Sequence, residues 1–220
     1  MNKELDFITS LHQSTKRDYK ERMFNQKVEA MMVARNFEKD FFDGERKNGY
    51  GGYRYIPNLL TPFVKKIIDY YKLTNNSKVL DVGCGKGFLL HEIKKLLPNI
   101  NICGFDISKY SIENSKEEVK KYLFIHKAQD KFPFEDKSFD LVLSINTLHN
   151  LYVYDLEKSL NELERVGKKK YLVVESYRNE EELFNLQCWA LTAECFFNKK
   201  EWQWLFKQFN YSGEFELIYF

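Results

Sequence analysis

Three alternating glycines and a later carboxylate are the residues whose types and spacing best suit ligand binding. Residues 79–90 read Val-Leu-Asp-Val-Gly-Cys-Gly-Lys-Gly-Phe-Leu-Leu, which indicates a short apolar strand, a glycine turn and the start of a helix. Glycines in such a turn let backbone N–H groups approach a ligand with no Cβ in the way. Asp106 ends a second apolar run 21 residues after Gly85, close to the roughly 20-residue interval at which a carboxylate reaches ribose hydroxyls. The pattern predicts a site for a nucleoside cofactor.

Two further side chains are candidates for proton transfer because each follows an apolar run that reads as a strand. His149 comes shortly after residues 139–144, and Glu175 follows residues 171–174. Ligands in open α/β folds bind at the carboxyl ends of the strands. A histidine with its usual pKa of about 6.5 suits proton removal near neutrality, and Glu175 can accept a proton or orient a cationic substrate. A hydrogen-bonded helix start for His149 and a structural ion pair for Glu175 are the open alternatives.

A loop rich in glycine and tyrosine is a candidate for binding the substrate. Residues 43–57 hold four glycines and three tyrosines, so they do not form a regular helix. We predict that Tyr50, Tyr53 and Arg54 close over a polar ligand, as mobile active-site loops do. Arg46, Lys47 and Arg54 suit a phosphate or carboxylate. An ordinary surface loop is the alternative.

The scaffold that must position these residues alternates strands with helices. Apolar runs that lack a period of two are typical of parallel strands covered on both faces, and their alternation with helices predicts a doubly wound α/β sheet. A cap residue followed by proline at 61–62 predicts a helix start, and Ser108 is expected to cap a helix that runs to about Tyr122. The expected strands are 79–82, 100–105, 123–126, 139–144, 171–174 and 214–220.

The two flanks of the chain differ from this alternating core. Residues 1 to about 43 are predicted to be helical, and residues 181 to about 197 to form one long apolar helix. We expect 1–60 to be an N-terminal helical cap with its loop, and 61–220 to be the ligand-binding domain. The residues expected on one apolar face of the N-terminal helix are Phe24, Val28, Met31 and Met32.

Composition excludes several classes of function. The net charge of +2 gives no electrostatic argument for a nucleic-acid or membrane partner. The four cysteines form no Cys-x-x-Cys pair and have no histidine at zinc-ligand spacing, which predicts reduced thiols and no metal site. The first residues lack the apolar run of a signal peptide, and no run approaches the ~20 residues of a membrane span. We therefore expect a cytoplasmic protein that acts on a small molecule, and the oligomeric state stays open.

Several motifs in order resemble one known family, the class I S-adenosylmethionine-dependent methyltransferases. Residues 79–88 are similar to its first motif, hydrophobic-hydrophobic-Asp-hydrophobic-Gly-x-Gly-x-Gly, and 104–108 to its second. Residues 132–142 resemble the segment that leads into its fourth strand. The later landmarks of the family match 148–150 and 164–166, so the resemblance covers about residues 78 to 175.

The resemblance implies a cofactor, S-adenosylmethionine, and a role for each matching residue. Asp81, Gly83 and Gly85 would hold the methionine portion through carboxylate and backbone contacts. Asp106 would bind the ribose hydroxyls, and Ile107 would pack on the adenine.

The remaining implied contacts include one departure from the family pattern. Asn146 would face the sulfonium end of the cofactor. The family often has an acidic residue that binds the adenine amino group, and the corresponding place here is Ala128. Gln129 is the neighbouring side chain that can supply this hydrogen bond. The resemblance also implies a Rossmann-like, mostly parallel sheet with an antiparallel C-terminal strand.

These observations together predict methyl transfer to a small polar metabolite, including an anionic one, or to a sugar. O-methylation is favoured over N-methylation because a histidine base is available. Two rival functions remain open at this point. One is a nicotinamide-dependent oxidoreductase on a similar sheet, although Gly87 comes one residue before the third glycine of that fingerprint. The other is a non-catalytic S-adenosylmethionine-binding partner subunit.

Overall fold

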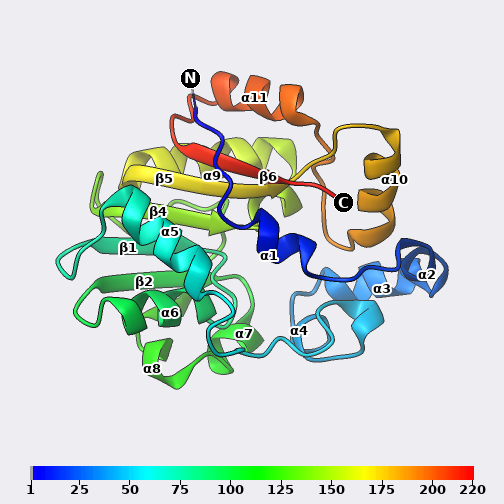
Figure 1. The fold of residues 1–220 in the computed structure, drawn as a ribbon, viewed down its shortest axis with the longest axis horizontal. Helices are drawn as coiled ribbons and strands as arrows, with labels where there is room; N and C mark the ends of the chain where they lie inside the picture. Colours follow the sequence, from blue (N-terminus) through cyan, green and yellow to red (C-terminus); the bar gives the residue numbers. More distant parts are fainter. Residues whose placement is uncertain (1) are drawn as a thin grey trace.

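A single six-stranded sheet forms the centre of the computed structural model, which describes residues 2–220 (Figure 1). The strand order is β3-β2-β1-β4-β5-β6, and all neighbouring pairs are parallel. Val79 lies opposite Ile102 on one side and opposite Leu141 on the other. The strands are β1 (Lys78–Val82), β2 (Asn101–Asp106), β3 (Leu123–Ile125), β4 (Phe139–Ile145), β5 (Gly167–Glu175) and β6 (Glu214–Ile218).

Helices cover both faces of this sheet, so each strand buries its side chains on two sides. Val79 packs in one core with α5 (Thr61–Tyr71) and α6 (Phe88–Leu96). Leu80, the next residue, packs in the opposite core with α9 (Val153–Val166) and α11 (Lys199–Gln208). This arrangement confirms the predicted doubly wound α/β fold and explains why the strand sequences are apolar without alternation. The elements between these layers are α7 (Lys109–Glu113), α8 (Glu117–Lys120), η2 (Leu148–Asn150) and α10 (Glu180–Trp189).

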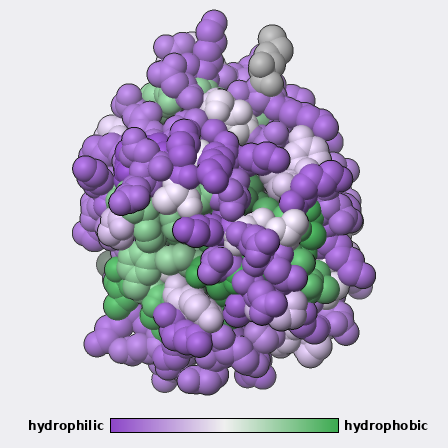
Figure 2. All heavy atoms as spheres, turned by 90° about the vertical axis from the view of Figure 1, so that its left-hand side faces the viewer, coloured by the Kyte–Doolittle hydropathy of each residue, from purple (hydrophilic) through white to green (hydrophobic). Residues whose placement is uncertain are grey.

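A helical cap lies beside the carboxyl ends of the strands, at the right of Figure 1. Its elements are α2 (Tyr19–Phe24), α3 (Lys27–Ala34), α4 (Lys39–Phe42) and η1 (Arg46–Asn48). Figure 2 views the molecule from the left-hand side of Figure 1, where the surface is mostly hydrophilic with hydrophobic side chains gathered across its middle. None of the helices formed by residues 2–220 is long and apolar enough to cross a membrane.

The helix predicted over residues 1 to about 43 is wrong in extent and in its buried face. The segment breaks into α1 (Thr9–Gln13) and the short helices of the cap. Phe24, Val28 and Met32 are 85%, 68% and 70% exposed. The small residues Ala30 and Ala34 are buried instead, against Leu191. The small side chains of Ala30 and Ala34 let α3 approach the segment around Leu191 closely. A pattern of large apolar residues does not predict this contact.

The predicted antiparallel C-terminal strand is also wrong, because β6 pairs in parallel with β5. Tyr171 lies opposite Glu214, and Glu175 lies opposite Ile218. The chain between the two strands forms α10 and α11, and this helical crossover returns it to the same end of the sheet. The single long helix expected from residue 181 to about 197 ends at Trp189, because Ala190 leaves it in an extended conformation.

Other predicted boundaries hold closely. The helix at 61–62 begins at Thr61, with proline in its first turn. Ser108 caps α7, with its Oγ accepting from the Ser111 N–H at 3.0 Å. The helix expected to continue to Tyr122 is divided into α7 and α8.

Residues near the N-terminus run alongside β6. The Leu5 N–H donates to the Phe215 carbonyl at 2.8 Å. The buried Glu216 carboxylate accepts from the backbone N–H groups of Phe7 and Thr9 at 2.7 and 2.9 Å, which caps the start of α1. The first residues therefore pack on the sheet layer, and the cap begins after α1. A domain division at residue 60 stays a prediction.

Candidate active site

The glycine turn after β1 has a backbone that only glycine adopts without strain. Gly83 and Gly85 have φ angles of +79° and +52°. A Cβ at Gly83 would overlap the Thr147 side chain, and one at Gly85 would face the Tyr53 ring at 3.4 Å. The turn therefore offers close backbone approach on the side covered by Tyr53.

Asp106, at the end of β2, is held in place by main-chain donors. Its Oδ2 accepts from the Gly85 N–H at 2.8 Å, and its Oδ1 accepts from the Ser108 N–H at 2.9 Å. Burial raises the pKa of this carboxyl despite these hydrogen bonds. Burial, with the charge of Asp106, raises the pKa of the neighbouring Asp81 to about 7. Two buried carboxyls close together favour a ligand that brings hydroxyl groups and a positive charge.

A cavity of about 300 Å³ opens beside this turn, and we call it the cofactor cavity. Asp81, the buried residue next to the end of β1, is not among the residues that line it. Tyr50 and Tyr53, predicted as substrate-binding residues, form part of its wall, and their rings lie 4.5 Å apart. The other predicted residues that line it are Gly83, Gly85, Asp106, Ile107, Gln129 and Asn146. These lining residues fit S-adenosylmethionine, because they offer close backbone approach at Gly83 and Gly85, the carboxylate of Asp106 and the apolar side chain of Ile107.

Asp43 connects the cap to the glycine turn, a role that the sequence did not indicate. Its Oδ2 accepts from Lys86 Nζ at 2.5 Å and from the Tyr110 hydroxyl at 2.7 Å, and its Oδ1 accepts from the Tyr53 N–H at 2.9 Å. Burial opposes ionisation of Asp43, but these hydrogen bonds outweigh it and lower the pKa. The loop that carries Tyr53 is thereby fastened to the motif that it covers.

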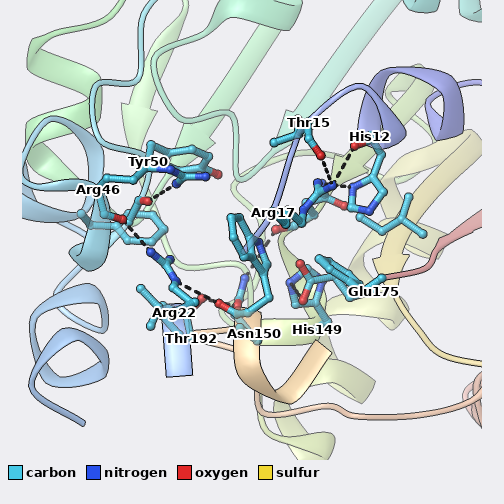
Figure 3. A pocket seen from close by; sticks show the side chains of 18 residues that line it. His12, Thr15, Arg17, Arg22, Arg46, Tyr50, His149, Asn150, Glu175 and Thr192 are labelled. Carbon is cyan, nitrogen blue, oxygen red and sulfur yellow. Dashed lines mark hydrogen bonds and ion pairs between the residues drawn. The ribbon is translucent and has the colours of Figure 1, made fainter. Parts of the chain in front are cut away.

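A second cavity of about 290 Å³ adjoins the first, and we call it the arginine cavity (Figure 3). In Figure 3, His149 and Glu175 lie on one side of it, and Arg46 lies on the opposite side. The side chains that line it with polar or aromatic groups include His12, Thr15, Arg17, Arg22, Arg46, Tyr50, Asn146, His149, Asn150, Glu175, Trp189 and Thr192.

His149 and Glu175, the two predicted catalytic residues, are brought together in this cavity. His149 Nε2 lies 3.5 Å from Glu175 Oε2. Burial lowers the pKa of His149 to about 3, so its ring is neutral at pH 7. Burial raises the pKa of Glu175 to about 7, although Arg17 and Lys27 oppose the rise. Glu175 is therefore the member of the pair whose protonation changes near neutrality.

The two cavities share a wall. Four residues line both of them, namely Phe41, Tyr50, Asn146 and Asn150. Asn146 has a φ of +54°, which is uncommon for a residue with a side chain, and its buried Oδ1 has no hydrogen-bond partner among residues 2–220. A strained residue with an unpaired polar atom therefore stands at the junction of the two cavities.

Two of the predicted residues, Asp81 and Arg54, are not among those that line the two cavities. Arg54 is exposed and lines neither cavity. Sequence reasoning singled out Arg46 but missed Arg17 and Arg22, which lie in the segment assigned to a plain N-terminal helix. Their spacing gave no signal, because they reach the cavity only through the path of the folded chain.

Comparison with known proteins supports the family that the order of the motifs indicates. A family profile described as "Methyltransferase domain" matches residues 73–213. The mitochondrial arginine-hydroxylase NDUFAF5 of Mus musculus is 30% identical over 115 residues, covering 52% of this chain and 33% of that protein. The demethylmenaquinone methyltransferase of Thermotoga maritima is 30% identical over 110 residues, covering 50% of this chain and 47% of that protein. The matched region thus spans between a third and a half of these relatives.

Solved structures share the fold. The YcgJ protein of Bacillus subtilis has a TM-score of 0.54 at 21% identity, with 66% of each chain covered. The complex between the Haloferax volcanii Trm112 methyltransferase activator and a putative methyltransferase gives a TM-score of 0.53 at 20% identity, covering 66% of this chain and 71% of that one.

The strand order alone is shared with dinucleotide-binding folds and does not distinguish the cofactor. The profile match over 73–213 makes that distinction, because it covers the glycine turn, Asp106 and the first five strands, β1 to β5, and ends just before β6. It favours S-adenosylmethionine over the nicotinamide alternative. The chain belongs to the methyltransferase-domain family, within the class I S-adenosylmethionine-dependent methyltransferases.

Proposed function

We propose that this protein transfers the methyl group of S-adenosylmethionine to an oxygen of a small polar acceptor bound in the arginine cavity. The observation that carries the proposal is the shared wall at Tyr50 and Asn146, with the His149–Glu175 pair on the acceptor side. A donor and an acceptor in adjoining cavities can meet without leaving the protein, and such positioning is worth ~7–11 kcal/mol of the barrier.

The cofactor is assigned to the first cavity by the chemistry of its lining. Asp106 would accept hydrogen bonds from the ribose hydroxyls, since both of its oxygens are already oriented by main-chain donors. The buried Asp81 would gain a positively charged neighbour in the amino group of the methionine portion, and Gly83 and Gly85 would let that portion approach the backbone. When bound, the cofactor supplies an electrophilic methyl group.

The adenine end is assigned to Ile107 and Gln129, which both line the cofactor cavity. Ile107 offers an apolar surface, and Gln129 offers an amide for the adenine amino group. The opposite end of the cavity is assigned to Asn146, the residue shared with the acceptor side.

The His149–Glu175 pair is proposed to remove the proton from the acceptor hydroxyl. Ionised Glu175 accepts it near neutral pH because its pKa of about 7 lies near the working range. Neutral His149 hydrogen-bonds the acceptor and holds Glu175 in place at 3.5 Å. Tyr50 and Tyr53 would close the site from the cap side and exclude water. A pair that can take up a proton favours oxygen over an already nucleophilic nitrogen.

The acceptor is proposed to be a small molecule rather than a nucleic acid, because the net charge is only +2 and the arginine cavity has a volume of about 290 Å³. A cytoplasmic location stays part of this proposal.

The test is formation of S-adenosylhomocysteine with a panel of hydroxylated metabolites and sugars. Because one relative is named for a hydroxylation, this product is a sharper readout than loss of the acceptor. His149→Ala should lower turnover much more than affinity for S-adenosylmethionine. His91→Ala, on α6 and outside both cavities, is the matched control.

Two results would overturn the proposal. One is a failure of S-adenosylmethionine and S-adenosylhomocysteine to bind at millimolar concentration in calorimetry. The other is normal turnover by His149→Ala with an identified acceptor, which would remove the pair from the reaction.

A further inference from the structure

Three arginines gather around one tryptophan at the mouth of the arginine cavity. The guanidinium carbons of Arg17, Arg22 and Arg46 lie 5.3, 4.9 and 5.0 Å from the centre of a Trp189 ring. These residues come from the segment after α1, from α2 and from η1, and Trp189 ends α10. Like charges repel, so a cluster of this kind is unfavourable unless another group offsets it.

No carboxylate forms an ion pair with these three guanidinium groups in the part of the chain that the structure describes, although the more distant Glu175 and Glu21 partly oppose the fall in the pKa of Arg17 and of Arg22. Arg35, Arg165 and Arg178 each form an ion pair with an acidic side chain, whereas none is recorded for the three arginines around Trp189. Arg17 Nε is buried without any hydrogen-bond partner among residues 2–220. Removal from water lowers the pKa of each of the three guanidinium groups, and lowers that of Arg22 to about 10. The cluster therefore lacks a carboxylate in direct contact with it.

Main-chain carbonyls hold the guanidinium groups in place while leaving several N–H groups free. Arg22 Nη1 donates to the Arg46 carbonyl at 2.6 Å, and Arg46 Nη1 donates to the Gly49 carbonyl. Arg17 Nη1 donates to the carbonyls of His12 and Thr15 at 3.0 and 3.1 Å. Each guanidinium has five N–H donors, so donors remain for a ligand, and their orientation is fixed before it binds.

The cluster also separates the arginine cavity from an outer one. The three arginines and Trp189 line both the inner cavity and an outer cavity of about 590 Å³. Cationic side chains outnumber acidic ones five to three around the outer cavity. Glu175 is the single acid lining the inner cavity among residues 2–220, and in Figure 3 it lies with His149 across the cavity from Arg46 and on the same side as Arg17. A charged group bound at the cluster would thus point the rest of its molecule toward His149 and Glu175.

We propose that the acceptor is a phosphomonoester whose phosphate is bound by Arg17, Arg22 and Arg46, and whose hydroxyl reaches His149 and Glu175. This inference rests on the proposed function, and it names the substrate class. A phosphomonoester carries about −1.5 to −2 charges at pH 7 and three acceptor oxygens, which match three forked guanidinium groups better than a singly charged carboxylate does.

The test is calorimetric titration of the full chain with inorganic phosphate at constant ionic strength, and with acetate in a parallel arm. We expect saturable phosphate binding and at least about tenfold weaker binding of acetate. Arg22→Gln and Arg46→Gln should each weaken phosphate binding about tenfold. Arg178→Gln, which removes an exposed guanidinium elsewhere, should leave phosphate binding unchanged.

The Arg46→Lys variant guards against a loss of folding in the glutamine variants. It keeps the charge but loses the fork, so its affinity should fall between wild type and Arg46→Gln while its melting temperature stays near wild type. Equal binding of phosphate by wild type and both glutamine variants, or tighter binding of acetate than of phosphate, would overturn the inference.

Failure of this inference is distinguishable from failure of the proposed function. Turnover of an unphosphorylated acceptor in the absence of any phosphate binding would remove the anion site and leave methyl transfer standing. Phosphate binding that depends on the arginines, with no S-adenosylhomocysteine from any phosphomonoester that binds, would leave the anion site and remove methyl transfer.

Discussion

The cofactor cavity and the arginine cavity share a wall, but different parts of the chain shape them. The first depends on backbone geometry in one stretch of chain, from Asp81 through the glycine turn to Asp106. The second depends on long charged side chains that converge from the N-terminal segment, the loop after α4, the ends of β4 and β5, and the end of α10. The contrast is between a site that is set by the local backbone and a site that is set by side chains from distant parts of the chain.

The two regions also differ in what holds them. The glycine turn sits on strands buried on both faces by two large apolar cores. The cap buries a small apolar cluster around Ala30, Ala34 and Leu191 and the ring of Phe42, and polar contacts also hold it. Lys27 Nζ donates to the carbonyls of Cys188 and Ala190 at 2.7 and 2.6 Å. Regions with few buried apolar contacts open at lower free energy than core strands, so the cap should open while the strands of the sheet stay folded.

The largest expected effect is on the cofactor side, from Asp106→Ala. The variant loses the acceptor for ribose hydroxyls and also the partner of the Gly85 N–H. We expect affinity for S-adenosylmethionine to fall about 100-fold or more, which corresponds to roughly 3 kcal/mol. Calorimetry measures it, with Asp69→Ala on the exposed side of α5 as control. An unchanged affinity would mean that the ribose is bound elsewhere.

Next in size is Glu175→Gln on the acceptor side. With an acceptor in hand, kcat should fall about 100-fold while cofactor affinity is kept, because proton transfer is lost and binding is not. Wild-type kcat/KM should rise with pH through about 7, as Glu175 ionises, and the variant should lose that rise. Exposed Glu157→Gln is the control.

A double variant sharpens this result. If His149 and Glu175 act as one unit, His149→Ala combined with Glu175→Gln should cost no more in kcat than the worse single variant. Full additivity of the two losses would show that the residues act independently.

Asp81→Asn should separate stability from binding. The folded pKa of Asp81 is raised to about 7, so ionising it opposes folding, and wild-type stability falls as the pH rises through about 7. At pH 8, without ligand, the variant should be more stable by about 2–4 kcal/mol, or roughly 5–10 °C in melting temperature. Its affinity for S-adenosylmethionine should fall about tenfold. Equal stability of the variant and the wild type at pH 8, measured by calorimetric melting, would contradict the claim that ionised Asp81 opposes folding.

The smallest effect is expected from Lys27→Met, which tests how the cap is held. The substitution keeps the length of the side chain but removes its hydrogen bonds to the end of α10. Amides of α2 and α3 should exchange hydrogen about tenfold faster, since about 1–2 kcal/mol of local stability is lost. Affinity for S-adenosylmethionine and exchange within β1 should not change. Exposed Lys20→Met on α2 is the control, and faster exchange across the whole sheet would show that cap and core unfold together.

This difference in construction also explains what the sequence could predict. Asp81, the glycines and Asp106 act through local backbone geometry, so their spacing along the chain predicted their meeting. The strands were found because apolar runs are required wherever both faces are covered. Arg17 and Arg22 meet Trp189 across more than 160 residues of chain, and no spacing rule encodes such a meeting.

The errors have equally specific causes. Phe24, Val28 and Met32 follow a helical period, yet the cap is fastened through Ala30, Lys27 and Arg22, so the large apolar side chains stay outside. The direction of β6 depends on where the preceding helices leave the chain, which hydrophobic pattern does not record. Arg54 belongs to the same loop as Tyr50 and Tyr53 but points out of the site.

The contact between Glu216 and the start of α1 can form only after the ribosome has made almost the whole chain. Phe7 and its partner Glu216 are 209 residues apart. At about 5–20 residues per second, the ribosome needs roughly 10–40 s to make that stretch. Until then α1 has no cap, and Arg17, four residues beyond its end, has no fixed position. A growing chain can therefore complete the nucleotide half of its site well before the half that selects the acceptor.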